Sequence, residues 1–363
     1  MKVKNIELRN FRNYDKLKLS LDFNNLVFLG NNAQGKTNLL EAIYYASTLR
    51  SFRTNDDFQL VLFDKEFCKI NLQIERQNET KNLQVIVSEN GKYIVLDGLP
   101  IKKFSDFIGE INAVLFTPND LKQFYTSPKD RRKFIDIELG KISSKYLNQL
   151  LVFQKLLKER NAYLKVKKFD KEYFDILTEQ LVNVEVEIMI ARAAFLKLIE
   201  KFANDIYKKI SDDGNILTII YDSSVDIDDA TKMKENLLKK YQHNFDRERE
   251  IGMTLISCNR EDFDMYLNGK KVIDFASQGQ KRSCILALKL GLLEIIKMKI
   301  NEYPIILLDD VLSELDETHR RNLFECIPDG VQIFVTATDI HIDEILKDTK
   351  YFRVEHGQVY KED

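Results

Sequence analysis

The chain has 363 residues, of which 44% are hydrophobic and 31% charged, a composition that excludes a disordered chain or a fibrous repeat. Its length predicts about two domains, or one large domain with an insertion. A net charge of −2, from 55 basic and 57 acidic side chains, excludes a globally basic nucleic-acid binder and leaves local patches open. Since no apolar run could cross a membrane and no signal-peptide core precedes the first strand pattern, we expect a cytoplasmic protein with four reduced cysteines.

The expected secondary structure changes character along the chain. Strand patterns lie at 3–8, 17–21, 26–29, 68–74, 83–87 and 93–96, with one helix over 38–46. A charged helix opens at Ser127-Pro128, and longer amphipathic helices follow at 144–164 and 172–210. Strands at 216–221, 253–256, 263–267, 305–308 and 332–335 then alternate with helices near 230–241, 280–299 and 318–327. This alternation is typical of an α/β protein with a helical insertion.

The most specific motif stands between the strand at 26–29 and the helix that follows it. It fits the GxxxxGK[ST] pattern and consists of Gly30, Asn31, Asn32, Ala33, Gln34, Gly35, Lys36 and Thr37. The two glycines let the backbone turn tightly and direct its N–H groups at a β-phosphate. Lys36 adds a positive charge at the β- and γ-phosphates, and the Thr37 hydroxyl is a ligand for Mg²⁺. We therefore expect ATP and Mg²⁺ to bind here.

A second motif is the apolar strand at 305–308, which ends in two acids. In the Walker B pattern, Asp309 holds Mg²⁺ through its water shell, and Asp310 orients or deprotonates the attacking water. Alone, adjacent acids after a strand are more often a solvated turn or a helix cap. The P-loop reverses that preference, so Asp310 and Lys36 are the expected catalytic residues and Thr37 and Asp309 the expected metal ligands.

A third motif precedes the helix at 280–299. It comprises Ser277, Gln278, Gly279 and Gln280, and its position shortly before Walker B is that of the signature motif of ABC-type ATPases. There a serine and a small glycine at a helix N-terminus cap the γ-phosphate held by the opposite subunit. Asp316, just past Walker B, matches the D-loop of the same scheme, and a plain helix cap is the alternative for Ser277. The motifs predict an ATP-dependent homodimer.

Together these patterns predict an α/β fold, an ABC-type P-loop ATPase head made of a β-rich lobe and an α/β core. The head is expected to comprise residues 1–125 and 250–363, with a helical lobe inserted at 126–249. Residues 126–170 carry 12 Lys and Arg against five Asp and Glu, so they could track nucleic-acid phosphates. The candidate DNA contacts are Arg131, Arg132 and Lys133, together with Arg53 after the P-loop helix. One alternative is a solvated helix face, and another is that these residues brace the helical lobe against the head.

The chain closely resembles the RecF family of bacterial recombination mediators. The matching segments, in family order, are Leu8-Arg9-Asn10-Phe11-Arg12-Asn13-Tyr14, the P-loop, Arg50-Ser51-Phe52-Arg53-Thr54, residues 116–121, Ser127-Pro128, residues 131–134, residues 276–282 and residues 307–316. The resemblance implies an SMC-like head without a long coiled coil, a weak DNA-stimulated ATPase that dimerises on ATP. It also implies binding to double-stranded DNA and to gaps or single-strand/double-strand junctions. The implied protein partners are RecR and RecO, which cooperate in loading RecA.

One segment departs from the family pattern. Ser257-Cys258-Asn259-Arg260-Glu261-Asp262 stands where RecF proteins usually carry Gly-Pro-His-Arg-Asp-Asp, so only Arg260 and Asp262 are kept. Thr338 occupies the switch position that is histidine in transporter ATPases, and residues 116–120 are a candidate Q-loop. Two alternatives share the nucleotide motifs: the soluble nucleotide-binding subunit of an ABC transporter, and a P-loop kinase. Thr338 and the basic helical insertion argue against the first, and the signature and D-loop argue against the second.

Overall fold

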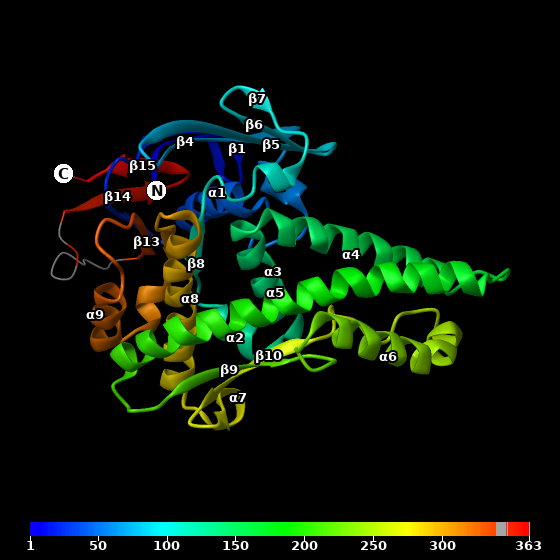
Figure 1. Cartoon of the computed structure of the whole chain (residues 1–363). Coiled ribbons are helices and arrows are strands. Elements are labelled where there is room, and N and C mark those ends of the chain that lie inside the picture. The colour runs from blue at the N-terminus through cyan, green and yellow to red at the C-terminus, as the bar shows by residue number, and fades with distance from the viewer. Residues whose placement is uncertain (339–345, 347, 363) are drawn as a thin grey trace. The chain divides into compact units, whose positions relative to one another are not determined.

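The computed structural model describes residues 1–338, 346 and 348–362, except for the side chains of residues 121–123. The chain forms two compact units (Figure 1). Unit 1 comprises Met1–Leu121, Phe202–Gly214 and Arg282–Asp363, and unit 2 comprises Lys122–Lys201 and Asn215–Lys281. The predicted division at residues 125/126 and 249/250 stays a prediction.

The described residues of unit 1 form two six-stranded sheets. The first is antiparallel, with the order β2-β1-β4-β5-β6-β7. Its strands are β1 (Lys2–Phe11), β2 (Tyr14–Ser20), β4 (Phe67–Arg76), β5 (Glu79–Ser88), β6 (Gly91–Leu96) and β7 (Leu99–Pro100). The second has the order β15-β14-β3-β13-β12-β8 and is parallel except for the β14–β15 hairpin. Its strands are β3 (Asn25–Leu29), β8 (Ala113–Phe116), β12 (Ile305–Asp309), β13 (Ile333–Ala337), β14 (Thr349–Glu355) and β15 (Gln358–Lys361).

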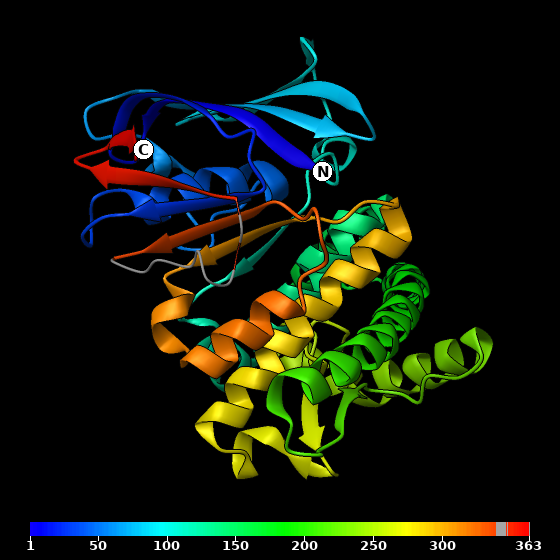
Figure 2. The same ribbon diagram turned by 90° about the vertical axis from the view of Figure 1, so that its left-hand side faces the viewer.

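The P-loop helix α1 (Lys36–Thr48) lies between these sheets (Figure 2). Strands β12 and β13 are buried at every residue, as parallel strands covered on both faces are, whereas β4 alternates between buried and half-buried residues. One core joins Ile6 of the first sheet, Ile43 of α1 and Phe28 of the second sheet. The remaining unit 1 elements are η1 (Asp57–Leu60), η2 (Phe104–Asp106), η3 (Val311–Glu314), α9 (Glu317–Glu325), the start of α2 (Asp120–Thr126), the end of α5 (Lys171–Ser211) and most of α8 (Gln278–Ile300).

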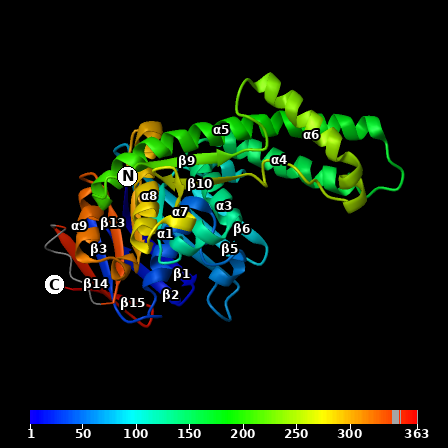
Figure 3. The same ribbon diagram turned by 90° about the horizontal axis from the view of Figure 1, so that it is seen from below.

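Unit 2 is mainly helical. Besides its parts of α2, α5 and α8, it contains α3 (Pro128–Ile142), α4 (Ser144–Tyr163), α6 (Ala230–Ile251) and α7 (Val272–Phe275), with an antiparallel sheet β11-β10-β9 of β9 (Leu217–Asp222), β10 (Asp262–Leu267) and β11 (Lys270–Lys271). Helix α5 contacts both α4 and α6 (Figure 3). Lys145 of α4 pairs with Glu187 at 3.0 Å, and Lys234 of α6 pairs with Glu179 at 2.8 Å.

The strand predicted at residues 253–256 is wrong, and the helix predicted near 230–241 continues to Ile251 in α6. The other predicted strands and helices are confirmed with small shifts of their ends. In the segment 253–256 the backbone N–H of Thr254 donates to Asn161 Oδ1 at 2.7 Å, and the N–H of Leu255 donates to Glu248 Oε1 at 2.7 Å. Because side chains accept from these backbone donors, the segment needs no neighbouring strand. Arg160, fully buried like Glu248, pairs with it at 2.7 Å.

Buried charges on α5 also hold the segment that departs from the RecF pattern. The backbone N–H of Cys258 donates to Glu185 Oε1 at 2.8 Å, and Arg192 donates to the Cys258 carbonyl oxygen. Tyr241 donates to the other oxygen of Glu185 at 2.8 Å. Burial raises the pKa of Glu185 to about 7, against these two hydrogen bonds, which lower it. The segment is therefore fixed through its backbone.

Candidate nucleotide site

The P-loop backbone has a conformation that requires glycine at two positions. Gly30 has φ 153° and Gly35 has φ 123°, values that L side chains rarely adopt. A Cβ atom on Gly30 would lie 2.3 Å from the carbonyl oxygen of Val354, and one on Gly35 would lie 2.8 Å from Asn13 Nδ2. The loop can therefore pack against Val354 and Asn13 in this conformation only because both side chains are absent.

Lys36 begins α1 and folds over the loop. Its ammonium group donates to the carbonyl oxygens of Gly30 at 2.5 Å and Asn31 at 3.1 Å. Burial lowers the pKa of Lys36, and the carboxylates of Asp310 and Asp309 oppose that shift. The positive charge thus lies against the P-loop backbone, within electrostatic reach of Asp309 at the end of β12 and of Asp310 after it.

The structure brings Thr37 and Asp309 together across 272 residues of sequence. The Thr37 hydroxyl donates to Asp309 Oδ1 at 2.8 Å, and the buried hydroxyl of Thr336 donates to the same oxygen at 3.0 Å. Burial raises the pKa of Asp309, while these two hydrogen bonds lower it. A hydroxyl and a carboxylate are oxygen ligands of the kind that Mg²⁺ prefers. No cluster of three His, Cys, Asp or Glu occurs among the described residues, and Mg²⁺ bound with phosphates needs only one or two protein ligands.

Asp310 has a backbone geometry unusual for a residue other than glycine. Its φ of 51° lies in the left-handed region, and its N–H donates to Thr336 Oγ1 at 2.9 Å. Burial raises the pKa of Asp310, and the charge of Lys36 opposes that shift. A single threonine hydroxyl therefore holds both predicted Walker B acids.

The predicted trans residues lie at two helix N-termini and are mostly exposed. The Ser277 hydroxyl accepts from the N–H of Gln280 at 3.2 Å, and the Gln280 side chain accepts from the N–H of Ser277 at 3.0 Å, which forms a capping box. Gln278 and Gly279 are exposed between them. Asp316 caps α9 by accepting from the N–H of His319 at 2.9 Å, and this bond lowers the pKa of Asp316. Ser277 therefore caps its helix, as the alternative states, and this cap leaves Gln278 and Gly279 exposed for contact with a second subunit.

The candidate DNA contacts differ in exposure. Arg131 is buried, pairs with Asp262 and donates to the Phe124 carbonyl oxygen. Arg132 is half-buried and donates to the Glu261 carbonyl oxygen at 3.1 Å, and Lys133 is also half-buried. Arg53 is exposed. The named partners of Arg131 and Arg132 lie in unit 2 like the two arginines themselves, and both the DNA assignment and its alternatives stay predictions.

Several residues outside the nucleotide motifs support the P-loop. The amide of Asn13 donates to the Gln34 carbonyl oxygen at 2.8 Å, and the Tyr14 hydroxyl donates to the Gly35 carbonyl oxygen at 3.0 Å. At the β14–β15 turn, the N–H of His356 donates to Gln34 Oε1 at 2.6 Å. The β14–β15 hairpin, whose strands the sequence analysis does not predict, therefore holds the phosphate-binding loop in place. Its sequence signal was the His-Gly turn between two short alternating runs.

Two further predicted positions have a place in unit 1. Thr338 is exposed directly after β13, whereas its neighbour Asp339 lies outside the described residues. The candidate Q-loop at 116–120 joins β8 to α2, and there Asp120 pairs with Lys289 at 2.5 Å. Their roles stay predictions.

Comparison with known proteins decides the family. The model of the RecF/RecN/SMC N terminal domain matches residues 2–358. The DNA replication and repair protein RecF of Halalkalibacterium halodurans is 39% identical over 369 residues, covering 99% of this chain and 100% of that protein. RecF of Bacillus subtilis is 39% identical over 371 residues, with the same coverage. The chain belongs to the RecF family.

Solved structures agree with this assignment. The recombination mediator protein RecF-ATP of the RecFOR pathway superposes with a TM-score of 0.91 at 31% identity, covering 99% of this chain and 97% of that one. An Smc head bound to a winged-helix domain of ScpA has a TM-score of 0.59 at 13% identity, which shows a shared fold. The predicted α/β ABC-type head is thereby confirmed. In the described part of the chain, no helix has both the length and the apolar character that a membrane span requires.

Proposed function

We propose that this RecF-family chain is an ATP-dependent switch of recombinational DNA repair and replication. It binds ATP, dimerises on ATP, binds DNA at gaps or single-strand/double-strand junctions, and slow hydrolysis releases the dimer. The observation that carries the proposal is the contact of the Thr37 hydroxyl with Asp309, which joins the P-loop to Walker B. Similarity to RecF proteins along essentially the whole chain, and to RecF-ATP in structure, supports it.

The chain's own groups divide the work. The N–H groups of residues 30–37 and the ammonium of Lys36 bind the phosphates, and Thr37 and Asp309 would hold Mg²⁺. When bound, Mg²⁺ supplies positive charge that neutralises phosphate oxygens. Asp310 orients or deprotonates the attacking water, and a pKa raised by burial favours that role because it increases the basicity of the carboxylate.

The exposed signature and D-loop residues suit contact with a second copy. Ser277, Gln278, Gly279 and Gln280 would face the γ-phosphate held by the partner, and Asp316 would lie beside the shared nucleotide. A helix N-terminus attracts such an anion through its unpaired N–H groups. ATP would then bridge the two copies, and its hydrolysis would separate them.

The proposed partners follow from the family. DNA would contact the basic residues Arg131, Arg132, Lys133 and Arg53, and RecR and RecO would act with this chain in loading RecA, in the cytoplasm. The naming of the structural relative within the RecFOR pathway supports the protein partners. The transporter-subunit and kinase alternatives are not favoured, because the chain covers RecF proteins along their whole length.

Two Walker B variants test the chemistry. Asp310→Asn should bind ATP normally. It should hydrolyse ATP more slowly by a factor of roughly 100 or more, because a general base contributes on that scale. Asp309→Asn should instead weaken binding of Mg²⁺ with nucleotide. Binding is measured with a fluorescent ATP analogue, and hydrolysis by phosphate release.

The control for these variants is Asp22→Asn, which removes an exposed carboxylate paired with Lys4 at 2.8 Å. It should hydrolyse ATP like the wild type. If the phenotypes of the Asp309 and Asp310 variants were exchanged, their assigned roles would be reversed. If the wild-type chain with DNA and Mg²⁺ did not hydrolyse ATP, the proposed switch would be wrong.

A further inference from the structure

The first sheet of unit 1 has one buried face and one open face. Leu8, Ile70, Val85 and Ile94 stand opposite one another on β1, β4, β5 and β6, and all four are buried in the core that contains α1. Successive residues of a strand point to opposite faces of its sheet. The adjacent row therefore lies on the other face, here called the outer face, and consists of Lys16, Arg9, Lys69, Ile86 and Tyr93.

Three neighbouring cations lie in this row. Arg9 on β1 stands between Lys16 on β2 and Lys69 on β4; Lys16 and Arg9 are exposed, and Lys69 is half-buried. In the described part of the chain, no acid forms an ion pair with any of the three. Glu7, in the next row of the outer face, pairs instead with Lys18 at 2.6 Å. Because like charges directly opposite each other destabilise a sheet, a bound anion would relieve the repulsion within the row.

Two aromatic rings share the outer face with these cations. Tyr93 on β6 is 53% exposed. Phe67 stands two residues before Lys69 on β4, and therefore on the same face, and it is half-buried. The guanidinium of Arg9 lies 5.5 Å from the centre of the Phe67 ring. Aromatic rings beside cations on an open sheet are the groups with which proteins bind unpaired bases and their phosphates.

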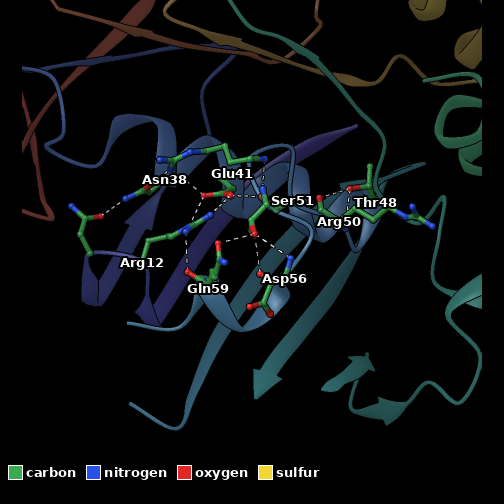
Figure 4. Close-up of polar contacts among 11 residues, drawn as sticks. Arg12, Asn38, Glu41, Thr48, Arg50, Ser51, Asp56 and Gln59 are labelled. Carbon is green, nitrogen blue, oxygen red and sulfur yellow. Dashed lines mark hydrogen bonds and ion pairs between the residues drawn. The ribbon is translucent and has the colours of Figure 1, made fainter. Parts of the chain in front are cut away.

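The turn between β1 and β2 joins the outer face to the nucleotide site. Arg12 in this turn donates to the buried carboxylate of Glu41 on α1, from Nε at 2.9 Å and from Nη2 at 2.7 Å (Figure 4). Asn13, the next residue, donates to the Gln34 carbonyl oxygen of the P-loop at 2.8 Å. The two strands that carry Arg9 and Lys16 are therefore attached directly to the P-loop and to the helix that follows it.

We propose that the outer face of the first sheet binds single-stranded DNA. Unpaired bases stack on Tyr93 and Phe67, and phosphates contact the three cations of the row. A single strand suits this face better than a duplex, because the bases of a duplex are stacked on one another and cannot lie on aromatic side chains. The inference rests on the proposed DNA binding at gaps and junctions. It assigns the single-stranded part of such a site to unit 1, whereas the candidate contacts at residues 131–133 belong to unit 2.

The experiment measures the fluorescence anisotropy of a labelled deoxythymidine oligomer, and of a blunt-ended duplex of equal length, with the full chain, ATP and Mg²⁺. Tyr93→Ala should bind the oligomer roughly fivefold more weakly or worse, because stacking of one base contributes on that scale, and should bind the duplex like the wild type. Tyr93→Phe keeps the ring and should keep the wild-type affinity. Replacing Lys16 and Lys69 by glutamine should reduce the salt slope of log affinity for the oligomer by about 0.7 per lost phosphate contact.

Unit 1 offers a matched control for each kind of change. Tyr360, on β15 of the second sheet, is 55% exposed, and Tyr360→Ala should keep the wild-type affinity for the oligomer. Lys208→Gln removes an exposed lysine near the end of α5 and should leave the salt slope unchanged. Equal losses in Tyr360→Ala and Tyr93→Ala would show a general effect of removing an exposed ring, against the proposal.

The remaining outcomes separate this inference from the proposed function. A wild-type chain that binds the duplex but not the oligomer would overturn the single-strand site alone, as would an oligomer affinity and salt slope unchanged in both Tyr93→Ala and the lysine double variant. If Tyr93→Ala did not fold by circular dichroism, the lysine variant would decide. Equal losses for duplex and oligomer would show that the outer face contacts duplex DNA instead. A wild-type chain that binds neither would overturn the proposed DNA binding itself.

Discussion

Replacing Thr336 by valine removes one hydroxyl from the Walker B site at nearly constant volume. That hydroxyl donates to Asp309 at 3.0 Å and accepts from the N–H of Asp310 at 2.9 Å, and Thr336 is fully buried. A lost hydrogen bond to a charged group costs about 1.5–3 kcal/mol, and an amide left unpaired about 1–3 kcal/mol. Since Asp310 is only half-buried, water can partly replace the second bond, and we expect a total of roughly 2–4 kcal/mol. Urea unfolding followed by circular dichroism measures this, which suits a chain that has no tryptophan.

The same variant should alter the pH dependence of hydrolysis. The Thr336 hydroxyl lowers the pKa of Asp309, so its loss raises that pKa further. The carboxylate would then be protonated at a higher pH, and the acidic limb of the kcat profile should move upward in pH. Thr336→Ser, which keeps the hydroxyl, should restore both properties.

The matched control is Ser47→Ala, which removes a buried hydroxyl bonded to the Tyr44 carbonyl oxygen at 2.8 Å. It should lose stability without moving the acidic limb. Wild-type stability and an unshifted limb in Thr336→Val would refute the inferred dual role of this threonine.

Three other consequences can be measured independently. Ser277→Arg should bind ATP but fail to dimerise in sedimentation experiments, because a bulky cation would occupy the place of the γ-phosphate; a normal ATP dimer would exclude the trans assignment. Replacing Arg132 and Lys133 by alanine, with buried Arg131 left in place, should reduce the salt slope of log DNA affinity by about 0.9 per lost phosphate contact, and an unchanged slope would move the DNA site elsewhere. Because the folded-state pKa of Glu185 is raised to about 7, its stabilising contribution is full below the unfolded pKa and is lost as pH rises through 7. Glu185→Gln should flatten the fall of urea stability between pH 5 and 8, which we expect to be at most about 3 kcal/mol, and an equally steep fall in the variant would contradict this.

The nucleotide motifs could be predicted because each is a local pattern with its own chemistry. Lys36 and Thr37 follow from a glycine loop between a strand and a helix, and Asp309 from acids at the end of an apolar strand. The residues that support the site could not be predicted, because they become neighbours only through tertiary packing. Thr336 lies 27 residues from Asp309, and nothing in its local sequence shows that its hydroxyl meets both acids. Glu41 sits on a helix whose pattern gives no reason to expect a buried carboxylate.

The count of charged residues in the sequence does not locate the positive surface, for a different reason. The excess of Lys and Arg over residues 126–170 is a property of the sequence, but it does not show which cations are compensated by distant acids. Arg131 pairs with Asp262, and Arg160 with Glu248. Both partners lie outside the counted segment. The net charge of a segment therefore overstates its positive surface wherever its Lys and Arg side chains form ion pairs with acids elsewhere in the chain.

The segment at residues 257–262 departs from the RecF pattern by more than its missing histidine, because it also gains a backbone hydrogen-bond donor. Proline, usual at the second position of that motif, has no backbone N–H, whereas Cys258 has one and donates it to the buried carboxylate of Glu185. A buried carboxylate needs such donors, so Glu185 on α5 requires a residue other than proline at position 258. Arg192 holds the Cys258 carbonyl oxygen from the same helix, and Asp262, a residue kept from the motif, pairs with Arg131. The altered segment is thus anchored to α5 and α3 by buried charges, and substitutions in it should be judged by their effect on those anchors.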